Sequence, residues 1–327
     1  MKGRIVWIDW AKAIGIMIVV FCHTPQNDNF VKSFLYAFQM PLFFILAGYL
    51  HRKPQYAMLK QLKKYWKTLI VPYLLFQVMF YPYLLVQQSI QKGIVLNDFS
   101  QFVIMPFVRC FWGIPIDGPT WFIFALLITK IIADVVFRSR FSVYLVIFLC
   151  SLSIIGAYFI WMDDKLNITF AIDSLFNFFP FFFVGYYLKA YDILKNEKRS
   201  KCLVKIGVYF SISTLLLLAD IDNYIFQRVF FYVLGLFGSL FIINICKVLT
   251  KCPDFIQTIS MGSIIILGLH WMFIGTTNFL IEYFFNLEEG ILYSVIEAVL
   301  LVLAITSINY IIIKFCQRHF KILLGYR

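Results

Sequence analysis

The sequence predicts an all-α fold, a polytopic membrane bundle of about ten transmembrane helices. The chain of 327 residues is 61% hydrophobic and only 14% charged, whereas soluble domains carry about 25% charged residues. Apolar runs of about 20 residues, the length that spans a bilayer, recur along the whole chain. The polar segments between these runs are short, so we expect a single integral membrane domain over residues 1–327.

The expected spans follow from the apolar runs in chain order. The first run carries an aspartate and a lysine and has no small-residue cleavage site, so it predicts a permanent helix rather than a signal peptide. The ten spans are expected at residues 5–24, 34–50, 67–86, 119–137, 141–162, 169–190, 203–219, 224–246, 257–280 and 291–313.

The net charge of +12 is distributed unevenly between the connections. Lysines and arginines gather in alternate connections, and most acids lie in the others. This is the positive-inside pattern, and it predicts that both termini are cytoplasmic. The excess charge therefore indicates topology, and we expect no nucleic-acid partner. The seven cysteines show no metal-ligand spacing, so we expect no metal.

Two connections have further features. Residues 87–118 contain an apolar and aromatic piece, FSQFVIMPFVRCFWGIP, which is too short to span once its proline is allowed for, and which suggests an interfacial or re-entrant segment. The stretch HRKPQYAMLKQLKKYWKT alternates apolar and basic residues near helical spacing. It predicts an interfacial amphipathic helix or a positively charged topological anchor.

Lys12 and His23 bracket an apolar run, KAIGIMIVVFCH. Ionisable residues inside a span cost about 2.5–3.5 kcal/mol each at mid-helix and mark candidate functional sites. Eleven residues at about 100° each return to nearly the same helix face, displaced by about 16 Å. One helix would thus present a cation and an imidazole on one stripe, although snorkelling of the lysine and interfacial placement of the histidine are ordinary alternatives.

Other ionisable residues fall inside the expected spans. Asp9 with Lys12, and Lys130 with Asp134, have the spacing of local ion pairs. Four more would lie at a depth similar to that of His23 and form a buried polar constellation if they face inward: Asp173, Arg228, His270 and Glu297. Pairing between helices is the structural alternative for these four. A histidine with carboxylates to orient it is what acyl transfer to a hydroxyl requires.

Several segments resemble the acyltransferase-3 family of integral membrane O-acyltransferases. Lys12-x10-His23 resembles the family's Arg/Lys-x10-His signature, and RIVWIDWAKAIGIMIVVFCH resembles the fucose 4-O-acetylase-like branch. AFQMPLFFILAGYL, PTWFIFALLI, FPFFFVGYYLK and ISMGSIIILGLHWMF resemble later family segments in the right order. The similarity runs from residue 4 to about 314.

The chain departs from the family pattern at several positions. Gln39 stands where the branch usually has histidine, and Ala47 where it has serine. The R-x-x-R before the third helix appears as Lys64-x-x-Lys67.

The resemblance implies a ten-helix enzyme that moves an acetyl group from cytoplasmic acetyl-CoA to a sugar hydroxyl, with a succinyl donor as the alternative. The acceptor would be an outward-facing or lipid-linked glycan, and the enzyme would carry out polysaccharide O-acetylation in a bacterial inner membrane. The CoA phosphates would need cations, for which the candidates are Lys12, Lys64 and Lys67.

The resemblance also suggests roles for the remaining candidates. His23 would be the general base or would accept the acetyl group itself. Asp173 or Glu297 would orient the imidazole, and Arg228 or Trp121 would stabilise the oxyanion. Substrate-binding candidates are Trp121, His270 and Gln39, with core packing as the alternative for the first two. On composition alone a transporter or flippase for lipid-linked sugars fits equally well, and a membrane sensor is the third class.

Overall fold

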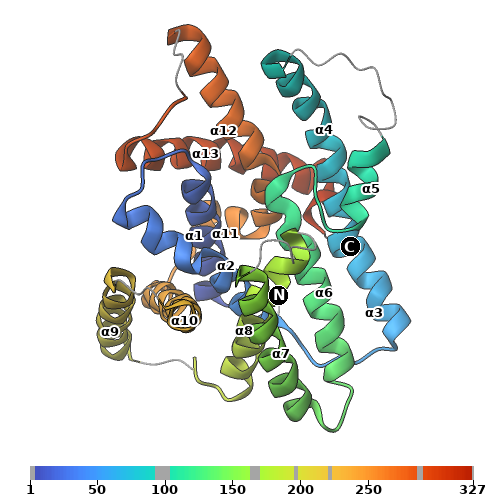
Figure 1. Ribbon diagram of the computed structural model, residues 1–327, viewed down its shortest axis with the longest axis vertical. Helices are drawn as coiled ribbons and strands as arrows, with labels where there is room; N and C mark the ends of the chain where they lie inside the picture. Colours follow the sequence, from blue (N-terminus) through green and yellow to red (C-terminus); the bar gives the residue numbers. More distant parts are fainter. Residues whose placement is uncertain are drawn as a thin grey trace. The chain divides into compact units, whose positions relative to one another are not determined.

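The computed structural model describes residues 4–92, 104–162, 170–194, 198–219, 223–285 and 290–325 (Figure 1). These residues are helical, without strands, so the predicted all-α fold is confirmed. The α-helices are α1 (Val6–His23), α2 (Phe30–Leu50), α3 (Met58–Tyr65), α4 (Val71–Lys92), α5 (Met105–Phe111), α6 (Trp121–Val136), α7 (Ser142–Met162), α8 (Phe170–Ala190), α9 (Arg199–Leu218), α10 (Tyr224–Val248), α11 (Asp254–Met261), α12 (Ser263–Phe285) and α13 (Val295–His319). The short helices are η1 (Trp66–Ile70, a π-helix), η3 (Gly118–Thr120) and η5 (Lys321–Leu324).

Within the described residues, ten helices are long and apolar enough to cross a membrane. They correspond one to one with the ten spans expected from the sequence, and the protein is a multi-pass membrane protein. Most boundaries differ by a few residues, and two of the shifted beginnings have a structural reason. The third span begins earlier than expected, and the ninth begins later, at Ser263 instead of residue 257.

The early start of the third span has a structural reason. The amphipathic stretch predicted after α2 is a helix, α3, and it continues through η1 into α4 without a break, so that the whole span is Met58–Gln87. A π-helix holds an extra residue in one turn and is often found at functional sites. The prediction of a helix is thus confirmed, and this helix forms the lysine-bearing end of the third span.

The late start of the ninth span results from a break at Gly262, between α11 and α12. A Cβ atom at Gly262 would collide with the side chain of Ile313. The expectation of one continuous helix from residue 257 is therefore wrong at its beginning, where α11 ends and α12 starts anew. In the connection at residues 87–118, α5 provides one short helix, and residues 93–103 lie outside the described part of the chain.

The chain divides into two compact units that interleave along the sequence. The first comprises Met1–Arg52, Phe178–Ser263 and Ile281–Ile313, and the second comprises Lys53–Asn177, Ile264–Leu280 and Lys314–Arg327. In the first unit, α1 packs against α2, α10 and α11, and α2 also packs against α10. In the second unit, η1 packs against α4 and α6, and α5 packs against α4.

Two glycines allow the backbones of α2 and α8 to touch within the first unit. A Cβ atom at Gly48 would collide with the backbone carbonyl of Phe182, and one at Gly185 would collide with the carbonyl of Ile45. Because lipid provides no hydrophobic force between helices, membrane helices associate through such close packing of small residues. Both glycines belong to segments that carry the family resemblance, AFQMPLFFILAGYL and FPFFFVGYYLK.

Candidate functional site

Lys12 and His23 both lie on α1, which is a continuous helix from Val6 to His23. The predicted stripe is therefore present: eleven residues turn the helix through three full turns plus about 20° and advance about 16 Å. Both residues are partly buried. α1 lies in the interior of its unit, since most of its side chains are buried.

The imidazole of His23 is held by its own helix. Its Nδ1 lies 2.8 Å from the carbonyl oxygen of Val19, one turn earlier. A carbonyl can only accept a hydrogen bond, so Nδ1 carries the proton of the neutral ring and Nε2 is the basic nitrogen. The ring is thus fixed in the tautomer that a base or nucleophile at Nε2 needs.

Lys12 makes a contact that connects α1 to α11. Its Nζ donates a hydrogen bond of 2.6 Å to the carbonyl oxygen of Ser260. Ser260 lies in the last turn of α11, where backbone carbonyls lack intrahelical partners and carry the negative end of the helix dipole. Lys12 therefore caps the carboxyl end of α11, and it does not snorkel to a membrane surface.

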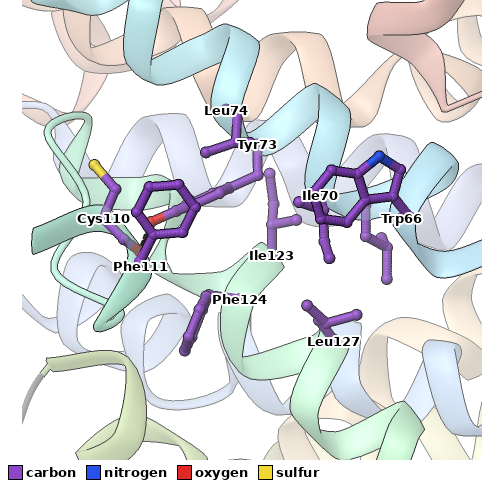
Figure 2. A pocket seen from close by; sticks show the side chains of 10 residues that line it. Trp66, Ile70, Tyr73, Leu74, Cys110, Phe111, Ile123, Phe124 and Leu127 are labelled. Atoms are coloured by element: carbon purple, nitrogen blue, oxygen red, sulfur yellow. Dashed lines mark hydrogen bonds between the residues drawn. The ribbon is translucent and has the colours of Figure 1, made fainter. Parts of the chain in front are cut away.

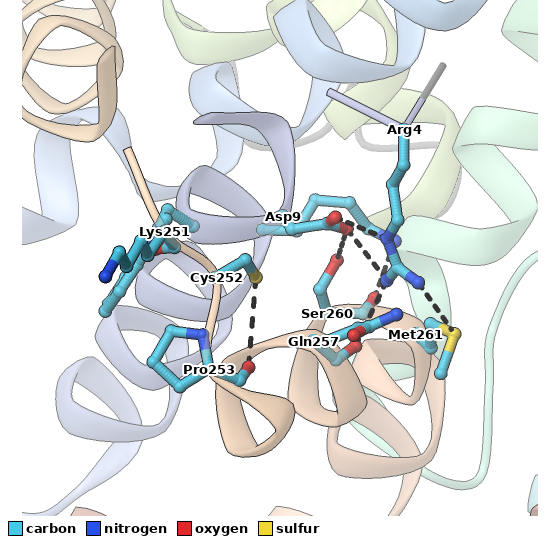
Figure 3. Close-up of polar contacts among 10 residues, drawn as sticks. Arg4, Asp9, Lys251, Cys252, Pro253, Gln257, Ser260 and Met261 are labelled. Atoms are coloured by element: carbon cyan, nitrogen blue, oxygen red, sulfur yellow. Dashed lines mark hydrogen bonds and ion pairs between the residues drawn. The ribbon is translucent and has the colours of Figure 1, made fainter. Parts of the chain in front are cut away.

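Asp9 has partners other than the one expected from its spacing. Its Oδ2 accepts a hydrogen bond of 2.5 Å from Arg4 Nε, and its Oδ1 accepts one of 2.7 Å from Ser260 Oγ. Figure 3 shows this carboxylate between the two donors. Asp9 thus neutralises Arg4 and holds Ser260, while Lys12 contacts the backbone of the same serine. The expected Asp9–Lys12 contact pair is replaced by this network between α1 and α11.

Gln39 is a buried amide in the middle of α2. Its side chain is 3% exposed, and its Oε1 has no hydrogen-bond partner among the described residues. A buried polar atom without a partner costs about 1–3 kcal/mol. An unpartnered acceptor in a helix that packs against α1 fits a ligand with a hydroxyl donor.

Arg228 and Glu297 also belong to the first unit. Arg228, in the first turns of α10, is partly buried, and its guanidinium lies over the ring of Phe231, 5.8 Å from the centroid. Glu297 is exposed: its Oε2 accepts a hydrogen bond of 2.8 Å from the backbone nitrogen of Ser294, and Ser294 Oγ accepts one from the nitrogen of Glu297. This is a capping box at the start of α13. The expectation of a buried Glu297 is therefore wrong.

Three further candidates belong to the second unit. Asp173 is partly buried in the first turn of α8, and its backbone carbonyl accepts a hydrogen bond from Asn177. Trp121 is the first residue of α6 and is 8% exposed, with its ring edge-to-face with Phe122. His270 is fully buried in α12, and its Nδ1 lies 3.0 Å and 2.9 Å from the carbonyl oxygens of Ile266 and Leu267.

Lys64 and Lys67 lie on α3 and η1, also in the second unit, and both are exposed. Lys130 and Asp134, on α6, lie near the same helix. Tyr65 donates a hydrogen bond of 2.7 Å to Asp134 Oδ2, and Lys130 Nζ lies 6.0 Å from the centre of the Tyr65 ring. No sequence pattern predicts this role for Tyr65.

A buried polar cluster at the start of α6 was also missed. Gln77 Oε1 accepts hydrogen bonds from the backbone nitrogens of Ile116 and Asp117, at 2.7 Å and 3.0 Å, and its Nε2 donates to Thr120 Oγ1 at 2.8 Å. Asp117 is fully buried, and both of its carboxylate oxygens lack hydrogen-bond partners within the described chain. Burial raises the pKa of Asp117 well above its ordinary value. The sequence signal for this cluster is an acid, Asp117, directly before the Gly-Pro-Thr-Trp at which a span begins.

The fold and these residues define a multi-pass membrane protein with a tautomer-fixed histidine on its first helix. The family profile described as "Acyltransferase domain" matches residues 5–314. The chain therefore belongs to the acyltransferase-3 family, and it is an acyltransferase. Comparisons with curated proteins and with solved structures give no match.

Proposed function

We propose that this enzyme transfers an acetyl group from cytoplasmic acetyl-CoA to a sugar hydroxyl of an extracytoplasmic or lipid-linked glycan. The proposal places it in the fucose 4-O-acetylase-like branch and in a bacterial inner membrane, with both termini cytoplasmic. Family membership and the ten spans support a membrane acyltransferase. The branch-like motifs support the sugar acceptor, and the distribution of lysines and arginines supports the orientation.

The geometry of His23 is the observation that carries this proposal. Its Nδ1 is bound to the carbonyl of Val19, so the lone pair of the neutral ring is on Nε2. Nε2 removes the proton from the sugar hydroxyl, and the oxygen attacks the thioester carbonyl. The new C–O ester bond forms, the C–S bond breaks, and the thiolate of CoA leaves and takes up the proton. General-base assistance of this kind contributes about 10²–10⁴-fold to a rate.

The remaining residues take supporting roles in the proposal. Lys12 uses one N–H on Ser260, and its remaining donors are candidates for a CoA phosphate. Lys64 and Lys67, in the second unit, stay separate candidates for the same role. Gln39 offers its buried Oε1 to an acceptor hydroxyl. Trp121 and His270 stay candidates for binding the sugar, Asp173 for orienting the imidazole, and Arg228 or Trp121 for stabilising the oxyanion. Glu297 is left out, because its carboxylate caps α13.

The test is acetyl transfer by the purified enzyme in lipid, with radiolabelled acetyl-CoA and a cell-envelope glycan fraction as the acceptor. His23→Gln keeps a polar side chain of similar size but removes the base. We expect label to enter the glycan with the wild-type enzyme and to decrease by at least about 10²-fold with His23→Gln. His319→Gln, at the end of α13, is the matched control, since its ring packs on Phe315 at an exposed site.

Full transfer by His23→Gln would contradict the catalytic role. Transfer of a radiolabelled succinyl group in place of acetyl would correct the donor and keep the mechanism. Movement of lipid-linked sugar across the membrane without consumption of either acyl donor would instead favour a flippase.

A further inference from the structure

An apolar cavity lies within the second unit, between the third span, α5 and α6. Its volume is about 110 Å³, smaller than the roughly 300–1,000 Å³ of sites for drug-sized ligands, so it suits a segment of a narrow chain better than a bulky group. It is lined by Trp66, Leu69, Ile70, Tyr73, Leu74, Cys110, Phe111, Ile123, Phe124 and Leu127. Figure 2 shows Trp66 and Leu127 toward one end of this space and Cys110 with Phe111 toward the other.

The chemistry of the lining favours a hydrocarbon occupant. Two polar groups of the lining are already used: Tyr73 donates its hydroxyl to the carbonyl of Cys110 at 3.0 Å, and the thiol of Cys110 contacts the carbonyl of Pro106. Beyond the indole N–H of Trp66 at the exposed end, the amides of a pantetheine arm would find no side-chain partners here. A hydrocarbon chain has no such requirement.

The cavity also runs along the membrane-spanning direction. The residues of the third span that line it extend from Trp66 to Leu74, which at 1.5 Å per residue is roughly 12 Å of helix. A lipid chain lies along the same direction in a bilayer. Both ends are open, since Trp66 is 53% exposed at one end and Phe111 is 66% exposed at the other. We call the end at Trp66 the mouth.

Lysines surround this mouth. Lys63, Lys64 and Lys67 lie within four positions of Trp66 and are exposed, and Lys63 is three residues before it, on the same helix face. The segment from Met58 to Ile70 contains four lysines, counting Lys60, and no acid. The nearby Asp134 is buried and accepts the hydroxyl of Tyr65. A cationic mouth above an apolar cavity is complementary to an anionic headgroup above a hydrocarbon chain.

We infer that this cavity binds a segment of one acyl chain of an anionic phospholipid, with the phosphate at Lys63. Tryptophan at the mouth is suited to the interface between headgroups and chains. Phospholipids surround this face of the span at high local concentration, so binding there requires no delivery step. The inference concerns a lipid site and does not depend on the identity of the glycan or of the acyl donor.

The experiment measures quenching of Trp66 by lipids with brominated chains. The full-length protein and its Trp66→Phe variant are placed in phosphatidylcholine vesicles that contain increasing fractions of brominated phosphatidylglycerol or brominated phosphatidylcholine. The difference between the two proteins isolates the fluorescence of Trp66. We expect this component to be half-quenched at a several-fold lower fraction of phosphatidylglycerol than of phosphatidylcholine. Lys63→Gln should reduce that preference about fivefold, since each lysine near an anionic lipid contributes on the order of 1 kcal/mol.

Cavity-filling variants test the chain-binding part separately. Leu127→Phe should abolish the quenching of Trp66 at low fractions of brominated phosphatidylglycerol, because the larger side chain occupies the cavity. Val135→Phe is the matched control on the same helix, since Val135 is 54% exposed and lies outside the lining. Lys53→Gln is the control for Lys63→Gln, because Lys53 is exposed and precedes α3. Size-exclusion chromatography identifies any misfolded variant, and Lys63→Gln, at an exposed site, keeps the test informative if Leu127→Phe fails to fold.

Three results would overturn the inference. The first is equal quenching by the two lipids at every fraction, and the second is unchanged quenching in Leu127→Phe. The third is displacement of the brominated phosphatidylglycerol by acetyl-CoA, or by a trace of prenyl phosphate, either of which would assign the cavity to a reactant of the enzyme.

Discussion

Ser260 Oγ donates a hydrogen bond of 2.7 Å to Asp9 Oδ1, although 251 positions separate the two residues along the chain. The backbone carbonyl of the same serine accepts a hydrogen bond from the Lys12 ammonium. A single residue of α11 therefore binds both charged side chains of α1, one through its hydroxyl and one through its backbone. These two contacts can be separated by mutation.

Ser260→Ala should remove the bond to Asp9 and keep the bond to Lys12, which needs only the backbone. A hydrogen bond to a charged group contributes about 1.5–3 kcal/mol, so we expect a lower midpoint of thermal unfolding in lipid discs. The acetyl-CoA KM should remain nearly constant, because Lys12 keeps its position. Ser307→Ala is the control, since Ser307 is exposed and bonds only within its own helix. Equal midpoints for the two variants would show that the Asp9–Ser260 bond contributes no net stability.

Lys12→Gln should change the acetyl-CoA KM and leave stability nearly unchanged, the reverse of Ser260→Ala. The amide can still donate to the carbonyl of Ser260, so stability should fall by no more than about 1 kcal/mol, the usual size of a charge–dipole contribution. The loss of the cation should raise the acetyl-CoA KM by about tenfold, which corresponds to about 1.4 kcal/mol, and Lys12→Arg should restore it. Lys251→Gln is the control, because it removes an exposed cation in the same unit. An unchanged KM in Lys12→Gln would limit Lys12 to its role as the cap of α11.

Gly185→Ala should destabilise the enzyme, because its Cβ would collide with the backbone carbonyl of Ile45 on α2. Overpacking of this kind typically costs about 1–3 kcal/mol, and more when backbone must move. Gly207→Ala is a strict control, since a Cβ there meets nothing within 4 Å and alanine favours a helix over glycine by about 1 kcal/mol. The unfolding midpoint should thus fall in the first variant and stay level or rise in the second. A fall of the same size in both would refute close packing at α2–α8.

Asp117→Asn should change the pH dependence of stability. Burial raises the pKa of Asp117 in the folded protein, so the folded state holds this proton more tightly than the unfolded chain. The free energy of unfolding therefore falls as the pH rises from the unfolded pKa toward the folded one. Asn removes this loss, so the variant should be more stable than the wild type at neutral pH and nearly equal to it at low pH.

Thermal unfolding in lipid discs between pH 4 and 8 measures this difference. Asp28→Asn, at an exposed aspartate, serves as the control. A lower midpoint for Asp117→Asn at neutral pH would mean that the carboxylate is charged and stabilising in the folded protein.

The sequence predicted the class of fold and the number of spans because both depend on local composition. An apolar run long enough to cross a bilayer can be recognised without knowing its neighbours. The positions of Lys12 and His23 on one stripe were predicted for the same reason, since helical geometry within a single span fixes them.

Contacts between helices could not be predicted in this way. Ser260 lies 251 positions from Asp9 along the chain, and only folding brings the two side chains together. The case of Glu297 is different, because Ser294-x-x-Glu297 is a capping-box pattern that the sequence displays. Glu297 was instead placed among the buried candidates because of its depth within an apolar run, and the capping pattern was overlooked.

The position of His23 as the last residue of α1 has a mechanical consequence. Its ring is tied to Val19 within the same helix, and the other end of that helix is fastened to α11 through Asp9 and Lys12. Because α1 is one unbroken helix, the contacts of Asp9 and Lys12 with α11 also set the position of the imidazole, about 16 Å farther along the same axis than Lys12.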